Sequence, residues 1–283
     1  MHLKNTAHRS ARRTDTSVHS PLRRAATAGL LLVIGSALAA TTACGKTESS
    51  GQDTAGAGSP SAPESTGKRV LWMGDSIADA EAPPLQAALK ASGVEFKSAA
   101  SDGGGTVVKG DGPSAELSKS TWKDFPENVA SFHPNVIAYQ ITTYDWGDQD
   151  QQRSSYERLA KAAQEAGAQL IIVSAPPFKI DNFYEPHKSA IESAPKVAQE
   201  IADNSGGKVR FLNASALWGN DNAAPKAQRS SDGIHSCQQG SAAFAKWFTD
   251  ELGTLHGFTP SAPSQWANGS WTKDEGFAKL NCG

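Results

Sequence analysis

Short blocks of apolar and polar residues alternate along the chain, and from Lys68 onward they predict strands that alternate with helices. Five runs rich in Val, Ile, Leu and aromatic residues have the length of buried strands. They are Arg69–Met73, Val94–Ala99, Asn135–Gln140, Leu170–Ser174 and Lys208–Phe211. Four longer segments carry apolar residues at helical spacing. They are Ile77–Ser92, Gln151–Ala166, His187–Asp203 and Ser241–Leu252. Proline disfavours a helix interior, so we expect Pro83 and Pro84 to break or kink the first helix and Pro195 to disturb the third.

This alternation predicts an α/β fold in which helices cover both faces of a five-stranded parallel sheet. In such a sheet, the active site lies at the carboxyl ends of the strands. The loops that follow the strands are therefore the candidate site. They are Gly74–Ser76, Asp102–Gly105, Thr142–Asp145, Ala175–Phe178 and Ser231–Cys237.

The segment 1–43 has the pattern of a secretory signal peptide. Residues 1–24 carry six basic residues against one acidic residue, and an apolar run follows over residues 25–40. A membrane span needs about 20 apolar residues, so this run is too short for a comfortable span. It ends in Thr41–Cys44, where a small residue before the cysteine resembles a bacterial lipobox, although the first threonine replaces the usual aliphatic residue. We expect lipidation at Cys44, with a plain signal peptide cut nearby as the alternative.

The segment that follows the cysteine is polar and small-residue-rich. Residues 45–67 contain no large apolar residue, so we expect 44–67 to be a flexible linker behind the lipid anchor. The folded domain is then 68–257, and 258–283 is a C-terminal tail. Without residues 1–24 the chain has 21 basic and 28 acidic residues, and this net charge of −7 argues against nucleic acid as a partner. We expect a monomer held by lipid at the extracellular face of a bacterial cell membrane, or secreted.

Ser76 stands at the junction of the first strand and the first helix, where a sharp turn exposes its hydroxyl near the helix N-terminus. A serine nucleophile needs a base. The chain beyond the signal offers His133, His187, His235 and His256. His235 directly precedes the last helix, and Asp232, three residues earlier, can accept its Nδ1 proton and leave Nε2 facing Ser76. We interpret Ser76, His235 and Asp232 as nucleophile, base and orienting acid. Taken singly, Ser76 is also typical of a helix N-cap and Asp232 of a loop carboxylate.

The Gly-Asp-Ser sequence after the first strand, the glycine loop Gly103–Gly105 after the second and Asp-x-x-His before the last helix resemble the SGNH (GDSL-type) hydrolases. The resemblance covers residues 68–255. It implies a flavodoxin-like three-layer α/β/α domain that needs no metal or other cofactor and that cleaves esters or transfers acyl groups. By position, Ser76, His235 and Asp232 match the family's nucleophile, base and acid. The α/β-hydrolase fold shares this chain order, but there the serine follows several strands.

The resemblance also implies an oxyanion hole made by the Ser76 N–H, a glycine N–H after the second strand and an Asn side chain after the third. The glycine is Gly103, with Gly105 as the alternative. The third motif departs from the family pattern, because Thr142–Asp145 replaces Gly-x-Asn-Asp and puts Tyr144 at the Asn position. Losing one oxyanion donor typically costs about 3–4 kcal/mol of transition-state stabilisation. We therefore expect modest activity or a substitute donor.

Tyr144 or Thr143 offers a hydroxyl as that substitute. An aromatic residue at this position also resembles the SGNH domains linked to membrane acyltransferases that O-acetylate envelope polysaccharides. The alternative is that Tyr144 simply packs beside Trp146.

The two cysteines beyond the lipobox, Cys237 and Cys282, are expected to form a disulfide in an oxidising compartment, with two free thiols as the alternative. Closing this loop is worth about 4 kcal/mol in the chain-entropy model, and it ties the tail to the loop of His235. The bridge then either holds His235 in register or only stabilises the fold. The tail aromatics either line a sugar-binding groove or anchor the tail. They are Phe258, Trp266, Trp271 and Phe277. No cluster of His, Cys or Asp has metal-binding spacing.

Together these features predict a secreted serine esterase that removes small acyl groups, acetyl among them, from an envelope glycan or another acylated molecule. One alternative is an O-acyltransferase that passes the same acyl group from Ser76 to a sugar hydroxyl. Another is a surface binding protein with weak catalysis, for which Tyr144 at the Asn position is the main observation.

Overall fold

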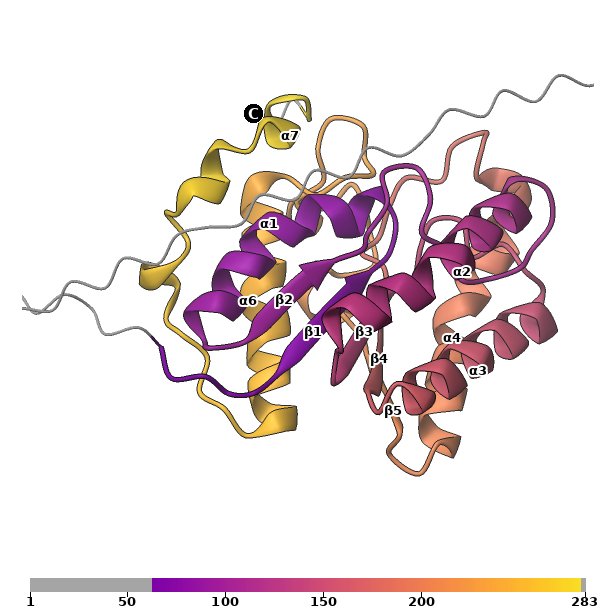
Figure 1. Cartoon of the computed structure of the whole chain (residues 1–283). Helices are drawn as coiled ribbons and strands as arrows, with labels where there is room; N and C mark the ends of the chain where they lie inside the picture. Colours follow the sequence, from indigo (N-terminus) through magenta and orange to yellow (C-terminus); the bar gives the residue numbers. More distant parts are fainter. Residues whose placement is uncertain (1–62, 281–283) are drawn as a thin grey trace, which may run out of the picture. The chain divides into compact units, whose positions relative to one another are not determined.

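The computed structural model describes residues 63–280, and these form a parallel sheet with helices on both faces (Figure 1). The strands are β1 (Arg69–Met73), β2 (Glu95–Ser98), β3 (Val136–Gln140), β4 (Gln169–Val173) and β5 (Val209–Leu212). Their order across the sheet is β2-β1-β3-β4-β5, and every pair is parallel. This is the strand order of flavodoxin-like folds, so the predicted fold class is confirmed.

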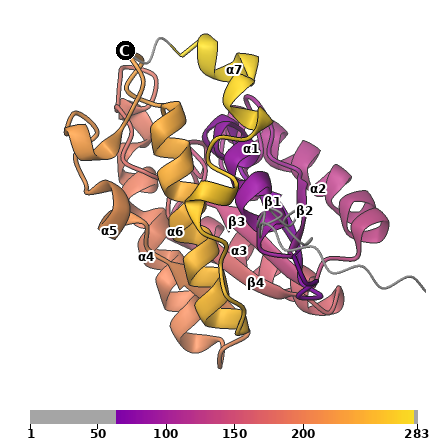
Figure 2. The ribbon, with the colours of Figure 1, turned by 90° about the vertical axis from the view of Figure 1, so that its left-hand side faces the viewer.

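Helices form the two outer layers (Figures 1 and 2). One face of the sheet carries α1 (Ser76–Ala91) and α6 (Gln238–His256). The other carries α2 (Pro113–Phe132), α3 (Gln149–Glu165) and α4 (Lys188–Asn204). Short helices complete the chain. They are η1 (Glu185–His187), α5 (Ser215–Trp218), η2 (Pro225–Ala227), η3 (Pro263–Gln265), η4 (Ser270–Lys273) and α7 (Glu275–Ala278).

Alternation along the strands divides the core into two halves. In β1, Val70 and Trp72 pack against α1 and α6, whereas Leu71 and Met73 pack against the opposite layer. Successive side chains of a strand point to opposite faces, so a run that is apolar at every position covers both. This is why the central strands are uninterrupted apolar runs, and why they were predictable.

Helix α1 corrects one expectation, because it runs from Ser76 to Ala91 without a break at Pro83 and Pro84. Pro84 is itself buried in the core side of the helix, together with Leu85. Burial of this face offsets the cost of prolines in a helix interior, which is about 3 kcal/mol each. Pro195 likewise lies inside the continuous helix α4.

Helix α2 has no counterpart among the predicted helices. Its large apolar residues in the core, Trp122, Phe125, Val129 and Phe132, begin only at the middle of the helix. The first nine residues hold one large apolar residue, Leu117, and Pro126 interrupts the apolar stretch. Together these two features concealed the helical period.

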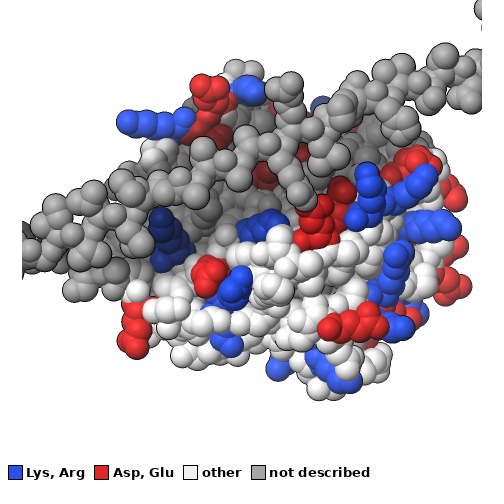
Figure 3. Space-filling view, in the orientation of Figure 1, with Lys and Arg blue, Asp and Glu red and all other residues white. Residues whose placement is uncertain are grey.

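The expectations about the chain ends fall largely outside the described residues. The signal over 1–43, the lipidated Cys44, most of the linker and Cys282 all lie there. At the start of the described part, Thr66 donates to the Gly93 carbonyl through both its N–H, at 2.9 Å, and its hydroxyl, at 3.0 Å. None of the helices in residues 63–280 is long and apolar enough to cross a membrane. On the face shown in Figure 3, acidic and basic side chains are mixed.

Candidate active site

The turn after β1 places Ser76 at the first position of α1. Gly74 has φ +155°, and a Cβ there would lie 2.5 Å from the Ala78 Cβ, so the turn accepts only glycine without rearrangement. Asp75 is the N-cap residue, and its Oδ1 accepts the Ile77 N–H at 3.0 Å. Its Oδ2 accepts the N–H of Thr143 at 2.7 Å and the Thr143 hydroxyl at 2.9 Å. Asp75 therefore fastens the loop after β3 to the loop that carries Ser76.

Ser76, His235 and Asp232 form a continuous chain of hydrogen bonds. His235 Nε2 lies 2.8 Å from the Ser76 Oγ, and His235 Nδ1 lies 2.7 Å from the Asp232 Oδ2. The predicted trio is thus brought together from the two ends of the domain. A base in contact with the serine and an acid in contact with the base is the geometry needed to activate a serine hydroxyl.

Asp232 is held as an ion by its surroundings. Partial burial alone would raise the pKa of Asp232, but hydrogen bonds from the His235 ring, the Ser230 hydroxyl and the N–H groups of Ile234 and His235 outweigh it, lowering the pKa to about 2. The local turn creates these bonds, because Gly233 has φ +74° and lets the chain fold back over the carboxylate. The carboxylate is therefore ionised and oriented at neutral pH.

The glycine loop after β2 packs directly on the nucleophile turn. Ser101 donates its N–H to the Gly74 carbonyl at 3.0 Å, and a Cβ on Gly105 would lie 1.9 Å from that same oxygen. Gly103 has φ +79° and open space at its Cβ position. Within residues 63–280, the N–H groups of Ser76 and Gly103 donate no hydrogen bond. These two predicted oxyanion donors are thus available for a ligand.

The third loop uses its polar groups internally. Asp145 is fully buried and accepts hydrogen bonds from four hydroxyls. They belong to Thr106, Tyr139, Thr142 and Tyr156. Burial raises the pKa of Asp145, although these hydroxyls oppose the rise. The Thr143 hydroxyl donates to Asp75 at 2.9 Å, so its proton is unavailable to an oxyanion.

Tyr144, the residue at the Asn position, lies in an aromatic cluster. Its ring centroid is 5.1 Å from that of Trp146 and 6.5 Å from that of Tyr184. Ile77 and Ile234, the neighbours of Ser76 and His235, pack in the same cluster. The expected packing of Tyr144 beside Trp146 is confirmed, and its role as an oxyanion donor stays a prediction.

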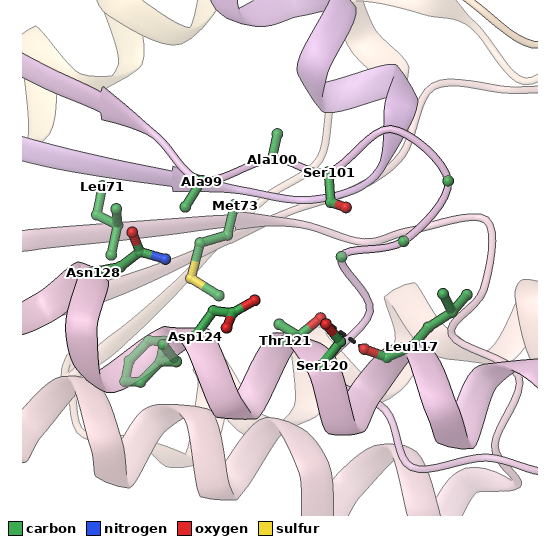
Figure 4. A pocket seen from close by; sticks show the side chains of 14 residues that line it. Leu71, Met73, Ala99, Ala100, Ser101, Leu117, Ser120, Thr121, Asp124 and Asn128 are labelled. Carbon is green, nitrogen blue, oxygen red and sulfur yellow. Dashed lines mark hydrogen bonds between the residues drawn. The ribbon is translucent and has the colours of Figure 1, made fainter. Parts of the chain in front are cut away.

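A groove of about 750 Å³ contains the candidate nucleophile and the candidate base. Ser76 and His235 lie in it, the first turns of α1 form one side, and the tail segment Ser270–Leu280 forms another. A second cavity of about 280 Å³ lies between the glycine loop and α2 (Figure 4). No member of the hydrogen-bonded trio lines that second cavity, so the larger groove is the candidate substrate site.

Sequence reasoning missed Glu81, which is 0% exposed beneath the site. Its Oε2 accepts from Gln140 Nε2 at 2.7 Å, and its Oε1 accepts from the Ser236 hydroxyl at 3.1 Å. Burial raises the pKa of Glu81 to about 7, although the charge of Arg229 and these hydrogen bonds oppose the rise. The only signal in the sequence was a charged residue one helical turn from Ile77 and Ala78, on the apolar side of the first helix.

The predictions about the disulfide and the tail have different outcomes. Cys237 is the N-cap residue of α6, and its expected partner Cys282 lies outside the described residues. The tail aromatics Trp266 and Trp271 are buried in the core and do anchor the tail. Over residues 63–280, no group of three His, Cys, Asp or Glu side chains is arranged to hold a metal ion.

Comparison with known proteins adds a family and a fold. A family model described as an SGNH domain fused to AT3 domains matches residues 43–243. No curated protein sequence matches the chain. Among solved structures, a putative acylhydrolase from Bacteroides fragilis is 17% identical with a TM-score of 0.53, and the match covers 69% of this chain and 92% of that one.

Two further structures are similar. A GDSL-like lipase from Bacteroides thetaiotaomicron is 18% identical with a TM-score of 0.51, over 66% of this chain and 89% of that one. An acetylxylan esterase from Geobacillus stearothermophilus is 18% identical with a TM-score of 0.50, over 68% of this chain and 96% of that one. At such identities the likeness shows a shared fold.

Proposed function

Because this chain belongs to the SGNH domain family, it is a serine hydrolase that acts on ester bonds, and we propose that it removes small acyl groups from a glycan of the bacterial envelope. The observation that carries the proposal is the unbroken contact from Asp232 through His235 to Ser76, at 2.7 and 2.8 Å. The groove beside Ser76 is open to a ligand much larger than a single acyl group.

The proposed reaction has two halves. His235 Nε2 takes the Ser76 proton as the Ser76 Oγ attacks the ester carbonyl, and the same proton then passes to the departing alcohol oxygen. The acyl group is left on Ser76. A water molecule then attacks this acyl-enzyme while His235 accepts its proton, and the acid leaves as Ser76 regains the proton. Asp232, ionised because hydrogen bonds lower its pKa to about 2, stabilises the imidazolium form of His235 in both halves.

The oxyanion of each tetrahedral intermediate is assigned to the free N–H groups of Ser76 and Gly103. Ser76 is the first residue of α1, and Gly103 is in the loop that packs on the turn before this helix. Backbone donors and the helix dipole favour negative charge at such a position. Of the two hydroxyls that could replace the Asn donor of the family, that of Thr143 is used by Asp75, which leaves only that of Tyr144. A missing donor lowers the rate by about 10²–10³-fold, so we propose a slow esterase.

The glycan substrate is supported by two descriptions of other proteins. The matching family model is described as an SGNH domain fused to AT3 domains, which agrees with the resemblance to SGNH domains linked to polysaccharide O-acyltransferases. One structure of the same fold is an acetylxylan esterase. The family description, with Tyr144 at the Asn position, also favours a second candidate function. In that candidate, Ser76 receives the acyl group and passes it to a sugar hydroxyl instead of water.

We also propose export and a lipid anchor at Cys44, supported by the basic start, the apolar run over 25–40 and the small residue before the cysteine. Labelled palmitate fed to cells that express the protein should be incorporated into the wild type and not into Cys44→Ser. Equal incorporation into both proteins refutes the anchor.

The enzymatic proposal is tested with a fluorophosphonate probe and 4-nitrophenyl acetate. The wild type should be labelled and should release 4-nitrophenol, whereas Ser76→Ala should do neither. The control is Ser154→Ala, an exposed serine on α3, which should behave as the wild type. A folded wild type that is neither labelled nor active supports a binding protein instead. Adding a sugar acceptor in competition with water then distinguishes transfer from hydrolysis by the product formed.

A further inference from the structure

The C-terminal tail lies beyond the family match, which ends at residue 243, yet it returns to the active site. Several contacts hold it there. Ser261 donates two hydrogen bonds to the end of α1: its N–H donates to the Ser92 Oγ at 2.9 Å, and its hydroxyl donates to the Ala91 carbonyl at 2.6 Å. Further along, Gln238 Nε2 donates to the Thr272 carbonyl at 2.7 Å. The tail is thus a docked part of the domain.

The docked tail forms one side of the groove in which Ser76 lies. The segment 270–280 faces the first turns of α1 across the groove. Its η4 packs against α1, and α7 lies above α1 in both views (Figures 1 and 2). The groove measures about 750 Å³, which falls within the range of ligand sites, roughly 300–1,000 Å³. A substrate that reaches Ser76 along this groove therefore contacts the tail.

Three carboxylates line the groove near the nucleophile. Asp79 lies one turn from Ser76 on α1, Asp102 adjoins Gly103, and Asp274 is on the tail. Burial raises the pKa of Asp79, and the negative charges of Asp102 and Asp274, which line the same groove, raise it further. Carboxylates accept hydrogen bonds from sugar hydroxyls and repel anionic ligands.

The tail also brings an aromatic pair and two cations. The rings of Trp271 and Phe277 lie 6.1 Å apart, edge to face, and both residues line the groove. Aromatic rings offer apolar surface to the C–H face of a sugar ring. Lys273 and Lys279 line the groove as well, so its three carboxylates exceed its lysines by one.

We propose that segment Ser270–Leu280 is part of the substrate-binding site, and that the groove between it and α1 holds an uncharged, hydroxyl-rich saccharide next to the ester that Ser76 attacks. This inference rests on the proposed esterase function and names the class of molecule that carries the acyl group. It also assigns substrate recognition to a segment outside the family match.

The test compares two substrates in the full chain. They are acetylated xylo-oligosaccharide, which is uncharged and rich in hydroxyls, and 4-nitrophenyl acetate, which has no sugar. The measured quantity is the ratio of the two kcat/KM values. In Asp274→Asn and in Phe277→Ala this ratio should fall at least about tenfold, mainly through KM for the saccharide, because a hydrogen bond to a charged group or a stacking surface is lost.

Asn keeps the N-cap bond that Asp274 makes to the Gly276 N–H, so the tail stays folded in Asp274→Asn. The matched control is Glu275→Gln, which removes a neighbouring negative charge outside the groove and should leave the ratio unchanged. A binding measurement by calorimetry in the Ser76→Ala background, with the same oligosaccharide, gives a readout that does not depend on turnover.

The outcomes separate the two proposals. If the wild type hydrolyses 4-nitrophenyl acetate while both Asp274→Asn and Phe277→Ala keep the wild-type ratio and affinity, the tail site is overturned and the esterase remains. Wild type that is neither labelled by the fluorophosphonate nor active refutes the esterase, and calorimetry then decides the tail site separately. An acetylated oligogalacturonide, which is anionic, should be the poorer substrate; an anionic substrate preferred over the neutral one overturns the uncharged class.

Discussion

Glu81 allows a quantitative prediction, because it is a carboxyl group with no exposure to solvent. Its two oxygens accept from Gln140 and from Ser236, the residue after His235. Arg229 faces it with a favourable charge and Asp75 with an unfavourable one. Burial nevertheless dominates and raises the pKa from 4.5 to about 7. The perturbation is Glu81→Gln. Glutamine has about the shape of the protonated acid, and it is uncharged at every pH.

The direction follows from the raised pKa. In the folded protein Glu81 stays protonated up to about pH 7, whereas in the unfolded chain it ionises near 4.5. The contribution of Glu81 to the free energy of unfolding is therefore complete below about pH 4.5 and is lost as the pH rises through 7. At about 1.4 kcal/mol per pKa unit, the loss is about 3 kcal/mol. Glu81→Gln has no such loss. The difference between its free energy of unfolding and that of the wild type should therefore rise by about this amount as the pH is raised.

The assay is urea unfolding, followed by tryptophan fluorescence, at several pH values from about 4.5 to about 8. All other titrating groups are present in both proteins and cancel in the difference. The control is Glu127→Gln, an exposed residue on α2, for which the difference from the wild type should not vary with pH. If the difference for Glu81→Gln is equally flat, the carboxyl group is not held neutral by burial and the reasoning is wrong.

Four further outcomes are expected. Asp232→Asn should lower kcat by about 10³–10⁴-fold without loss of folding, because the His235 ring loses its orienting anion. Thr143→Val should lower the free energy of unfolding by about 1.5–3 kcal/mol, measured in urea, because the buried Asp75 loses a hydroxyl donor; Thr143→Ser should restore it. Gly105→Ala should reduce the folded yield, judged by gel filtration, since its Cβ would lie 1.9 Å from a carbonyl oxygen. Cys282→Ser should lower the free energy of unfolding by up to about 4 kcal/mol, and unchanged turnover would show that the predicted bridge only stabilises.

The fold was largely predictable because its signals are local. The central strands β1, β3 and β4 are short apolar runs, and helices such as Gln149–Glu165 carry a clear stripe of buried residues. The exception, α2, has a polar half and an internal proline, so its period is visible only from Trp122 onward. Of the break or kink expected at Pro83 and Pro84, the break does not occur, since burial of this helix against the core overrides the local rule.

The hydrogen-bonded trio of the candidate site was predictable because Ser76, Asp232 and His235 stand in short motifs at strand and helix ends. Their supports were not. Glu81 is one carboxylate among many until the fold buries it, and nothing in its neighbours along the chain indicates Ser236 as a partner. The groove is less local still, because it depends on where a tail some two hundred residues away returns to α1.

The contact between Ser76 and His235 joins residues 159 positions apart, and it has a consequence for when activity appears. Strands β3, β4 and β5 of the same sheet all lie between these two residues in the chain. Contacts this distant along the chain form late in folding. Ser76 is therefore synthesised early and stays without its base until nearly the whole domain has been made and assembled, so no nascent fragment that ends before His235 has esterase activity.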